Sequence, residues 1–371
     1  MTDGLHPIYG PNKLKLGHFG MNAAGIAMTR APDYPKLSWQ RTIEAARLAE
    51  EGNFEVIVPF ARWKGFIEDD PVHQNGIVYD AYTFAAGVSQ ATEKSGVFVT
   101  SHIPTVHPIL AAKQTATIDH ISGGRFGLNV VAGWNRPELE MFGAAMREHD
   151  DRYDQADEWL MLLRRLWGEQ EAFDHEGKFY TIRKGISLPR PLQGAMPPIM
   201  NAGGSGRGMH FAAKNADVAF VILKSDDPDQ NAAQVAEYKD FARKEYGREI
   251  QVWSFGNVVQ RPTTKEAEEF HDYYVNQWGD EECVDGWLKL QAMNTQVLPP
   301  HVLIALRERF KAGSGGIPLI GSAEVIADRL VKLSKVGLDG LLLSWFDCNA
   351  EMPAFNAEVM PLLRQAGVRV I

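Results

Sequence analysis

The chain has 371 residues, of which 45% are hydrophobic and 23% charged, and its formal net charge is −9 at pH 7. This is the composition of a globular protein with an ample core, and the acidic balance argues against a nucleic-acid or anionic-membrane surface. No apolar run is long enough for a transmembrane helix, and no signal peptide is visible. Two cysteines, Cys283 and Cys348, favour a cytoplasmic protein with free thiols. A single disulfide is the alternative.

Apolar segments of strand length and of helix length alternate along the chain. The predicted strands are residues 14–19, 54–59, 97–101, 125–132, 199–202, 218–223, 252–259 and 340–345. The predicted helices include residues 39–51, 81–94, 109–121 and 152–167, with others after residue 208 and from Ser322. This rhythm is typical of an α/β protein, and a (β/α)₈ TIM barrel is the leading architecture. A doubly wound open sheet is the alternative, because periodicity does not reveal whether a sheet closes.

The helix over residues 39–51 illustrates how the element boundaries are predicted. Ser38 is the expected N-cap, and Gly52 is the expected stop. Trp39, Ala46 and Ala49 recur at helical spacing, which predicts that they face the sheet.

Two segments interrupt the alternation. Residues 173–182 (FDHEGKFYTI) predict a small hairpin that turns at Glu176-Gly177. Residues 279–316 are long and contain prolines and glycines, which predicts an insertion over the barrel mouth, helical over residues 301–311. We therefore expect one domain over residues 1–371, with insertions at about 171–197 and 279–316 at the carboxyl-terminal face of the barrel.

The loop after the fourth strand is unusually rich in polar and aromatic residues. Asn129, Trp134, Asn135, Arg136 and Glu138 lie within ten residues of one another. Polar groups at the carboxyl ends of barrel strands are where such enzymes bind ligands. The alternative, at even odds, is that Trp134 is an ordinary loop anchor and Glu138 a solvated charge.

A glycine-rich turn, GGSGRG over residues 203–208, lies between a predicted strand and a predicted helix. This arrangement presents backbone N–H groups and a helix dipole to a phosphate, with a hydroxyl from Ser205 and a charge from Arg207. An ordinary glycine turn is the alternative. For Arg152-Tyr153 and for residues 62–66, spacing alone favours core packing or solvation over ligand binding.

Histidines lie near several strand ends, but they do not have metal-ligand spacing. His18, His102 and His107 form no HxH or HExxH pattern, so no metal site is predicted. No GxSxG motif is present either, which argues against nucleophilic hydrolysis. The lack of acid–base and nucleophile signatures indicates that a cofactor supplies the chemistry.

Several segments resemble the bacterial luciferase-like flavin monooxygenases. They are TIDHISGGRFGLNVVAGW (residues 117–134), RYDQADEWLMLLRRLW (152–167), FDHEGKFY (173–180) and NAGGSGRG (201–208). The resemblance extends in order over nearly the whole chain. GWNRPELEMFG and RWKGF are most similar to the pyrimidine ring-opening branch, whose relatives act on sulfones and on other heteroaromatic or heteroatom compounds.

The resemblance implies a (β/α)₈ barrel that uses FMN as FMNH₂, together with O₂. It also implies a separate NAD(P)H:flavin reductase, a small-molecule substrate, and a homo-oligomer that is a dimer or tetramer. The oxidant implied by this branch is a flavin-N5-peroxide, although the sequence does not distinguish N5 from C4a.

Matching positions imply the roles of individual residues. Thr100, Asn129 and Trp134 correspond to an oxygen pocket, in which the two polar groups stabilise developing negative charge and the indole excludes water. The positions implied for flavin binding are Ala61, Arg62, Asn129, Glu138, Arg152, Tyr153, Gly203, Gly204 and Ser205. Of these, Arg152, Tyr153 and Ser205 lie on the phosphate side.

The expected activity is oxidation of a small N-heterocyclic or amide compound by a flavin peroxide, with His102, His107 and Trp345 as substrate contacts. Residues 102–107 (HIPTVH) are bulkier and more polar than in the pyrimidine branch, so uracil is not assigned as the substrate. The alternatives are organosulfur oxidation, a deazaflavin-dependent reductase on the same barrel, and a non-catalytic flavin-binding protein.

Overall fold

The computed structural model describes residues 6–24, 26–70, 72–194, 196–204, 206–223, 225, 227–292 and 300–370. Eight parallel strands form a closed ring, because β9 pairs with β11 on one side and with β8 on the other. Their bounds are β1 (Lys15–Phe19), β2 (Val56–Val58), β3 (Gly96–His102), β4 (Phe126–Val131), β7 (Ile199–Asn201), β8 (Val218–Phe220), β9 (Gln251–Gln260) and β11 (Gly340–Trp345). All eight were predicted, and the closed ring confirms the predicted (β/α)₈ barrel over the alternative of an open sheet.

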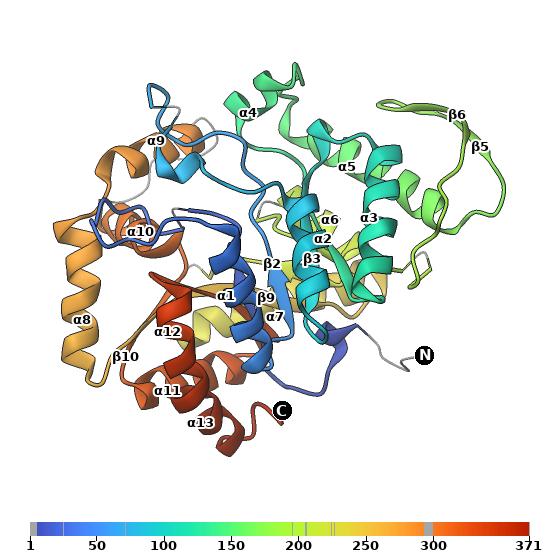
Figure 1. Ribbon diagram of the computed structural model, residues 1–371. Coiled ribbons are helices and arrows are strands. Elements are labelled where there is room, and N and C mark those ends of the chain that lie inside the picture. The colour runs from blue at the N-terminus through green and yellow to red at the C-terminus, as the bar shows by residue number, and fades with distance from the viewer. Residues whose placement is uncertain are drawn as a thin grey trace.

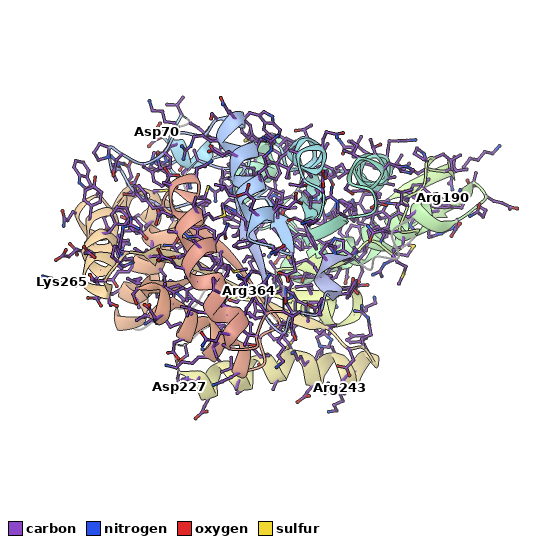
Figure 2. All side chains as sticks on the ribbon, turned by 60° about the horizontal axis from the view of Figure 1, so that its bottom comes forward. Asp70, Arg190, Asp227, Arg243, Lys265 and Arg364 are labelled. Carbon is purple, nitrogen blue, oxygen red and sulfur yellow. The ribbon has the colours of Figure 1, made fainter. Side chains whose placement is uncertain are left out.

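Helices surround this barrel (Figure 1). The α-helices are α1 (Trp39–Glu51), α2 (Ala81–Ala91), α3 (Pro108–Ser122), α4 (Arg136–Met141), α5 (His149–Gly168), α6 (Gly206–Asn215), α7 (Pro228–Tyr246), α8 (Thr264–Asp272), α9 (Glu281–Ala292), α10 (Pro300–Gly313), α11 (Ala323–Lys335), α12 (Cys348–Ala354) and α13 (Met360–Gln365). Short 3₁₀ or π turns cover Pro7–Tyr9, Gln74–Gly76, Ile103–Thr105, Tyr273–Gln277 and Phe355–Val359. Charged side chains line the outer helices, as Asp227 and Arg243 do near the two ends of α7 (Figure 2).

Helix α1 begins and ends as predicted, but the side chain of Trp39 does not lie where it was predicted. The Ser38 hydroxyl accepts a hydrogen bond from the Arg41 N–H, and Gly52 ends the helix. Ala46 and Ala49 are buried, whereas Trp39 is 40% exposed. Its indole lies against Gly87 of α2 and does not face the sheet. The prediction for Trp39 was wrong because its indole packs against the neighbouring helix, where Gly87 of α2 leaves space for the ring.

The interior of the barrel is filled by side chains from alternate strand positions. These are Phe19, Val56, Val58, Phe98, Met200, Val218, Phe220, Trp253, Phe255 and Leu342, with Ile8 packed against them. Gly127 on β4 is required here, because a Cβ atom at this position would lie 2.5 Å from the Phe98 ring. Each buried aromatic or aliphatic side chain contributes roughly 1.5–3 kcal/mol to folding. The lower barrel is therefore a solid core, and a ligand has room only at the mouth.

On β3, the side chains that face the barrel interior change from apolar to polar toward the carboxyl end of the strand. On β3, Phe98, Thr100 and His102 are two positions apart, so they face the same side. The parallel register sets Thr100 beside Asn129 and His102 beside Val131 of β4. Polar side chains thus begin where the core ends, at the carboxyl ends of β3 and β4.

One strand was missed by the sequence analysis. Strand β10 (Ile317–Gly321) pairs in parallel with the upper half of β9, where Ile317 lies opposite Gly256. In the sequence, Pro318 and the glycines that flank this strand are typical of a loop. The first residues of β9 pair with β8, and its later residues pair with β10 instead. β10 therefore widens the sheet at the mouth without joining the ring of eight strands.

Both predicted interruptions differ in detail from the structure. The hairpin consists of β5 (Phe173–Glu176) and β6 (Thr181–Gly185), joined by a four-residue turn instead of a tight turn at Glu176-Gly177. The segment 279–316 contains two helices, α9 and α10, so it is more helical than predicted. Residues 293–299 between them lie outside the described residues. The hairpin projects from one side of the barrel, and α9 and α10 lie on the opposite side (Figure 1).

The assignment of residues 1–371 to one domain stays a prediction. Cys283 and Cys348 are both free thiols, so the disulfide alternative is not realised. In the part of the chain that the structure describes, no helix has both the length and the apolar character needed to cross a membrane.

A buried ion pair fastens the end of the chain to the base of the barrel. The Arg369 guanidinium is fully buried and donates hydrogen bonds to the Glu55 carboxylate, at 2.9 Å, and to the Leu14 carbonyl. The same carboxylate accepts a hydrogen bond from the Leu16 N–H at 2.7 Å. This pair therefore joins the C-terminal segment to β1 and to the residue before β2.

Replacing Arg369 with alanine would leave the Glu55 carboxylate buried without its cation. We expect the Arg369→Ala variant to lose about 3–5 kcal/mol of unfolding free energy, measured by urea denaturation. Arg364→Ala is the matched control, because Arg364 is an exposed arginine near the same terminus (Figure 2). It should change stability by no more than about 0.5 kcal/mol. Equal unfolding midpoints for the two variants would contradict this role.

Candidate active site

Thr100 and Asn129 form the first part of the site. The Asn129 amide Nδ2 donates a hydrogen bond of 3.1 Å to the Thr100 hydroxyl, which donates in turn to the Pro59 carbonyl at 2.6 Å. Both side chains are buried. Among the described residues, the Asn129 Oδ1 atom has no hydrogen-bond partner. The structure therefore brings these two predicted residues together, and the amide retains an acceptor and a second N–H for a ligand.

Glu138, on α4, is a buried carboxylate and not a solvated charge. Its Oε1 atom accepts a hydrogen bond from the Trp63 N–H at 2.9 Å, and its Oε2 atom lies 3.3 Å from Nδ1 of His102. Burial alone would raise the pKa of Glu138, but His102 and the backbone N–H donors outweigh it and lower the pKa below its ordinary value. Glu138 is therefore ionised at neutral pH and ties together the loops that follow β2, β3 and β4.

The neighbouring residues Ala61 and Arg62 lie on the loop after β2. Ala61 is half-buried against the main core. Arg62 donates a hydrogen bond of 2.8 Å to the Asn75 carbonyl, and its guanidinium carbon lies 4.6 Å from the centre of the Phe66 ring. Arg62 thus holds the loop in shape through a cation–π contact. Its role as a flavin contact stays a prediction.

Trp134 lies on the loop between β4 and α4, and its place beside the Thr100–Asn129 pair stays a prediction. It packs against a small apolar cluster that includes Met28, Phe66 and Cys283, below the insertion helices. Its indole is 6.1 Å from the Phe66 ring. The sequence analysis gave Asn135 no role, yet this residue is buried, and neither atom of its amide has a partner among the described residues. In the sequence it resembles an ordinary helix N-cap, so no local signal distinguished it.

The predicted phosphate side is assembled around two glycines. A Cβ atom on Gly208 would lie 2.7 Å from the backbone of Gly203 and from the Tyr153 hydroxyl, so the turn, α6 and α5 meet here without side chains between them. Arg152 donates a hydrogen bond to the Gly133 carbonyl. The structure therefore brings Tyr153 near the glycine turn and Arg152 near Gly133, and a phosphate contact for Arg152 stays a prediction. Gly204 lies in open space, whereas Ser205 is outside the described residues.

The charge of Arg207, which the sequence analysis offered to a phosphate, is already paired. Its guanidinium forms an ion pair of 2.6 Å with Asp154 on α5. Backbone N–H groups and Arg152 are therefore the stronger candidates for binding an anion at this turn.

Two predicted substrate contacts lie elsewhere. His107 is exposed and caps α3, where its Nδ1 atom accepts a hydrogen bond from the Ile109 N–H. Trp345 is buried on the outer, helix-facing side of β11, beside Phe355 and 5.6 Å from the His18 ring. A cavity of about 50 Å³ adjoins His18 and Trp345 there. The structure therefore groups neither residue with Thr100, whereas His102 does face the mouth.

No three His, Cys, Asp or Glu side chains gather in the described part of the chain in a way that would hold a metal ion.

Asp280 anchors the insertion over the mouth. Its buried carboxylate lies 2.9 Å from Nε2 of His73 and 3.1 Å from Nε of Arg30, and it accepts a hydrogen bond from the Cys283 N–H. Burial alone would raise its pKa, but these partners outweigh it and lower the pKa of Asp280 to about 2. Because Arg30 and His73 belong to the loops after β1 and β2, α9 is fastened to both loops.

A family model described as luciferase-like monooxygenase matches residues 15–340. The chain is 30% identical over 351 residues to the pyrimidine monooxygenase RutA of Klebsiella pneumoniae (strain 342), covering 92% of this chain and 94% of that enzyme. It is 28% identical over 331 residues to the FMNH₂-dependent dimethylsulfone monooxygenase of Pseudomonas putida, covering 86% of each. The crystal structure of the long-chain alkane monooxygenase LadA superposes with a TM-score of 0.83 at 23% identity, covering 98% of this chain and 94% of that one, which shows a common fold.

Removing the charge of Asp280 should loosen α9 while the barrel stays folded. Because the pKa of Asp280 is lower in the folded protein than its ordinary value, the contact stabilises fully above about pH 4 and is lost as the pH falls toward 2. We expect the Asp280→Asn variant at pH 7 to lose on the order of 1–2 kcal/mol of protection in α9, measured by hydrogen exchange.

The matched control for this measurement is Glu282→Gln, because Glu282 is an exposed partner of the same Arg30. It should leave protection of α9 nearly unchanged. If α9 exchanged at the same rate in wild type and in the Asp280→Asn variant, Asp280 would not be the anchor.

Proposed function

The chain belongs to the luciferase-like monooxygenase family, and from this we propose that it is a two-component monooxygenase that uses reduced FMN and O₂ to oxidise a small N-heterocyclic or amide compound. The observation that carries the proposal is the hydrogen-bonded pair Thr100–Asn129 at the barrel mouth, with an unpartnered amide oxygen. Bound reduced FMN supplies the electrons that activate O₂. The electrons reach FMN through a separate NAD(P)H:flavin reductase, and the working protein is a dimer or tetramer.

The residues present fit FMN. A phosphate needs backbone N–H donors and a nearby cation, and the turn at Gly203 packs on Gly208 and Tyr153 with no side chain between them, so its backbone is accessible for close approach to such a group. Arg152, whose buried Nε atom has no partner among the described residues, supplies the cation. Ser205 adds a hydroxyl, and Gly204 adds an unobstructed backbone. Ala61, Arg62, Asn129 and Glu138 hold the ring and ribityl chain in this proposal.

The protein itself contributes orientation, hydrogen bonding and exclusion of water. Thr100 is held by the Pro59 carbonyl, so the Asn129 amide is fixed before a ligand arrives and pays no reorganisation cost. Trp134 and Phe66, beneath α9 and α10, screen the mouth from solvent. No side-chain nucleophile is required for this chemistry, which agrees with the lack of one in the sequence.

Sulfone oxidation is the second candidate. It is favoured by the 28% identity to the dimethylsulfone monooxygenase, which is close to the 30% identity to the pyrimidine monooxygenase. His102 lies near Thr100 and Asn129 at the mouth. Its hydrogen bonding would distinguish a sulfone from an N-heterocyclic or amide substrate.

Truncating Asn129 should impair oxygenation without preventing flavin binding. We expect the Asn129→Ala variant to lose roughly 10²–10³ in kcat, because a preorganised polar group is removed from the reacting region. O₂ uptake and product formation would be measured with a flavin reductase present, using uracil and dimethyl sulfone as trial substrates. Asn231→Ala is the control, since Asn231 is a buried asparagine on α7. Undiminished turnover in the Asn129→Ala variant, with FMNH₂ bound, would overturn the proposal.

The glycine turn gives an independent test of FMN binding. In the Gly208→Ala variant the new methyl group would meet the Gly203 backbone and the Tyr153 hydroxyl at 2.7 Å, which forces the turn to move. Overpacking of this kind costs about 1–3 kcal/mol, so we expect FMN affinity to fall about tenfold or more, measured by quenching of flavin fluorescence. Gly52→Ala is the control, because Gly52 ends α1 outside the proposed site and a Cβ there would also meet a neighbouring side chain, that of Asn356. Equal affinities in the two variants would argue against a phosphate site here.

A further inference from the structure

His102 is the last residue of β3, and its imidazole is held by a carboxylate. Nδ1 of His102 lies 3.3 Å from Oε2 of Glu138, and both side chains are almost fully buried. The other oxygen of Glu138 accepts a hydrogen bond from the Trp63 N–H. The position of the carboxylate is thus set by the loops after β2 and β4, and the carboxylate in turn sets the orientation of the ring.

This contact determines which nitrogen carries the proton. An ionised carboxylate attracts an N–H group and repels a nitrogen lone pair, so at 3.3 Å from Glu138 it is Nδ1 of His102 that carries the proton in the neutral ring. In the neutral ring Nε2 is then an acceptor. Among the described residues Nε2 has no hydrogen-bond partner. Nε2 is therefore available to accept a hydrogen bond from a ligand that carries an N–H group.

The ring also faces the place where a substrate would bind. His102 is two positions beyond Thr100 on β3, and Phe98, two positions before Thr100, lies in the barrel interior. All three side chains therefore face the interior side of the strand. Nε2 of His102 consequently lies along the same row as the Thr100–Asn129 pair.

We propose that His102 determines substrate specificity by accepting a hydrogen bond from an N–H group of the substrate through Nε2, with Glu138 as the positioning residue. This inference rests on the proposed oxygenase function and names its substrate class as N–H-bearing lactams, imides and amides. A sulfone presents two oxygen acceptors and no donor, so it would leave Nε2 unpartnered. An imidazolium ring would reverse the preference, because it would donate a hydrogen bond to a sulfone oxygen.

The test is a binding experiment without turnover. Full-length protein loaded with FMNH₂ under anaerobic conditions would be titrated with uracil, 1,3-dimethyluracil and dimethyl sulfone by calorimetry. Uracil and its dimethyl derivative share a ring and two carbonyl groups but differ in N–H donors. We expect wild type to bind uracil about tenfold more tightly than 1,3-dimethyluracil, the effect of one or more hydrogen bonds. In the His102→Leu variant this ratio should fall to about one.

Glu138→Gln separates positioning from mere packing. A glutamine keeps its oxygen for the Trp63 N–H and turns its amide NH₂ toward Nδ1, which makes Nδ1 the acceptor and Nε2 the donor. We therefore expect the preference to shift from uracil toward dimethyl sulfone, an outcome that a purely structural role would not produce. His120→Leu is the control, since His120 is an exposed histidine at the far end of α3. It should retain the wild-type ratio.

Several results of the titration would contradict the specificity role of His102. If wild type bound uracil no more tightly than 1,3-dimethyluracil, failed to bind either, or preferred dimethyl sulfone, the specificity role of His102 would be wrong. A ratio that survived in the His102→Leu variant would also contradict it. FMNH₂ binding would be recorded in the same anaerobic titrations, and O₂ uptake on separate aliquots of each preparation mixed with aerated buffer. If wild type neither bound FMNH₂ nor took up O₂, the proposed oxygenase function itself would be wrong. Normal FMNH₂ binding and O₂ uptake without a preference for N–H groups would contradict only the role of His102.

Discussion

A carboxylate buried at the mouth of the barrel stays ionised only if donors surround it, and the structure around Glu138 is arranged to meet that requirement. Backbone N–H groups of the loop after β2 reach it from one side, and His102 at the end of β3 reaches it from the other. Glu138 itself lies on α4, which follows β4. Three loops that are distant in sequence are therefore held in one arrangement, and the tautomer of His102 is a consequence.

The same arrangement recurs at two other places in the molecule. Asp280 joins α9 to Arg30 and His73 of the loops after β1 and β2, and Glu55 joins Arg369 to the base of β1. In each case a buried acid receives donors from segments far apart along the chain, so removing one partner leaves a charge uncompensated. The barrel thereby provides a rigid frame at its base and a fastened cover at its mouth, which suits chemistry that depends on positioning and on exclusion of water.

Such a site uses few reactive side chains. Thr100 and Asn129 are fixed by hydrogen bonds to each other and to the Pro59 carbonyl, and the glycine turn at Gly203–Gly208 keeps a backbone surface open. Membership of the luciferase-like monooxygenase family explains why few reactive side chains are needed, since a reduced flavin supplies the reactivity in this family. Relatives of similar identity are a pyrimidine monooxygenase and a dimethylsulfone monooxygenase, so the shared frame does not by itself fix the substrate.

The sequence by itself determined the eight barrel strands, the Ser38 cap and the glycine turn, because strand length, capping and turn chemistry are local properties of a few residues. It missed β10, since Pro318 and the glycines around it are a loop signal that only pairing with β9 overrides. It also placed Trp39 toward the sheet, although the indole lies on α2. Tertiary structure alone decided that His102 meets Glu138, that Trp345 faces away from the mouth and that Asp280 fastens α9. These contacts join residues far apart in sequence, and they follow from the parallel register that brings the strand ends together.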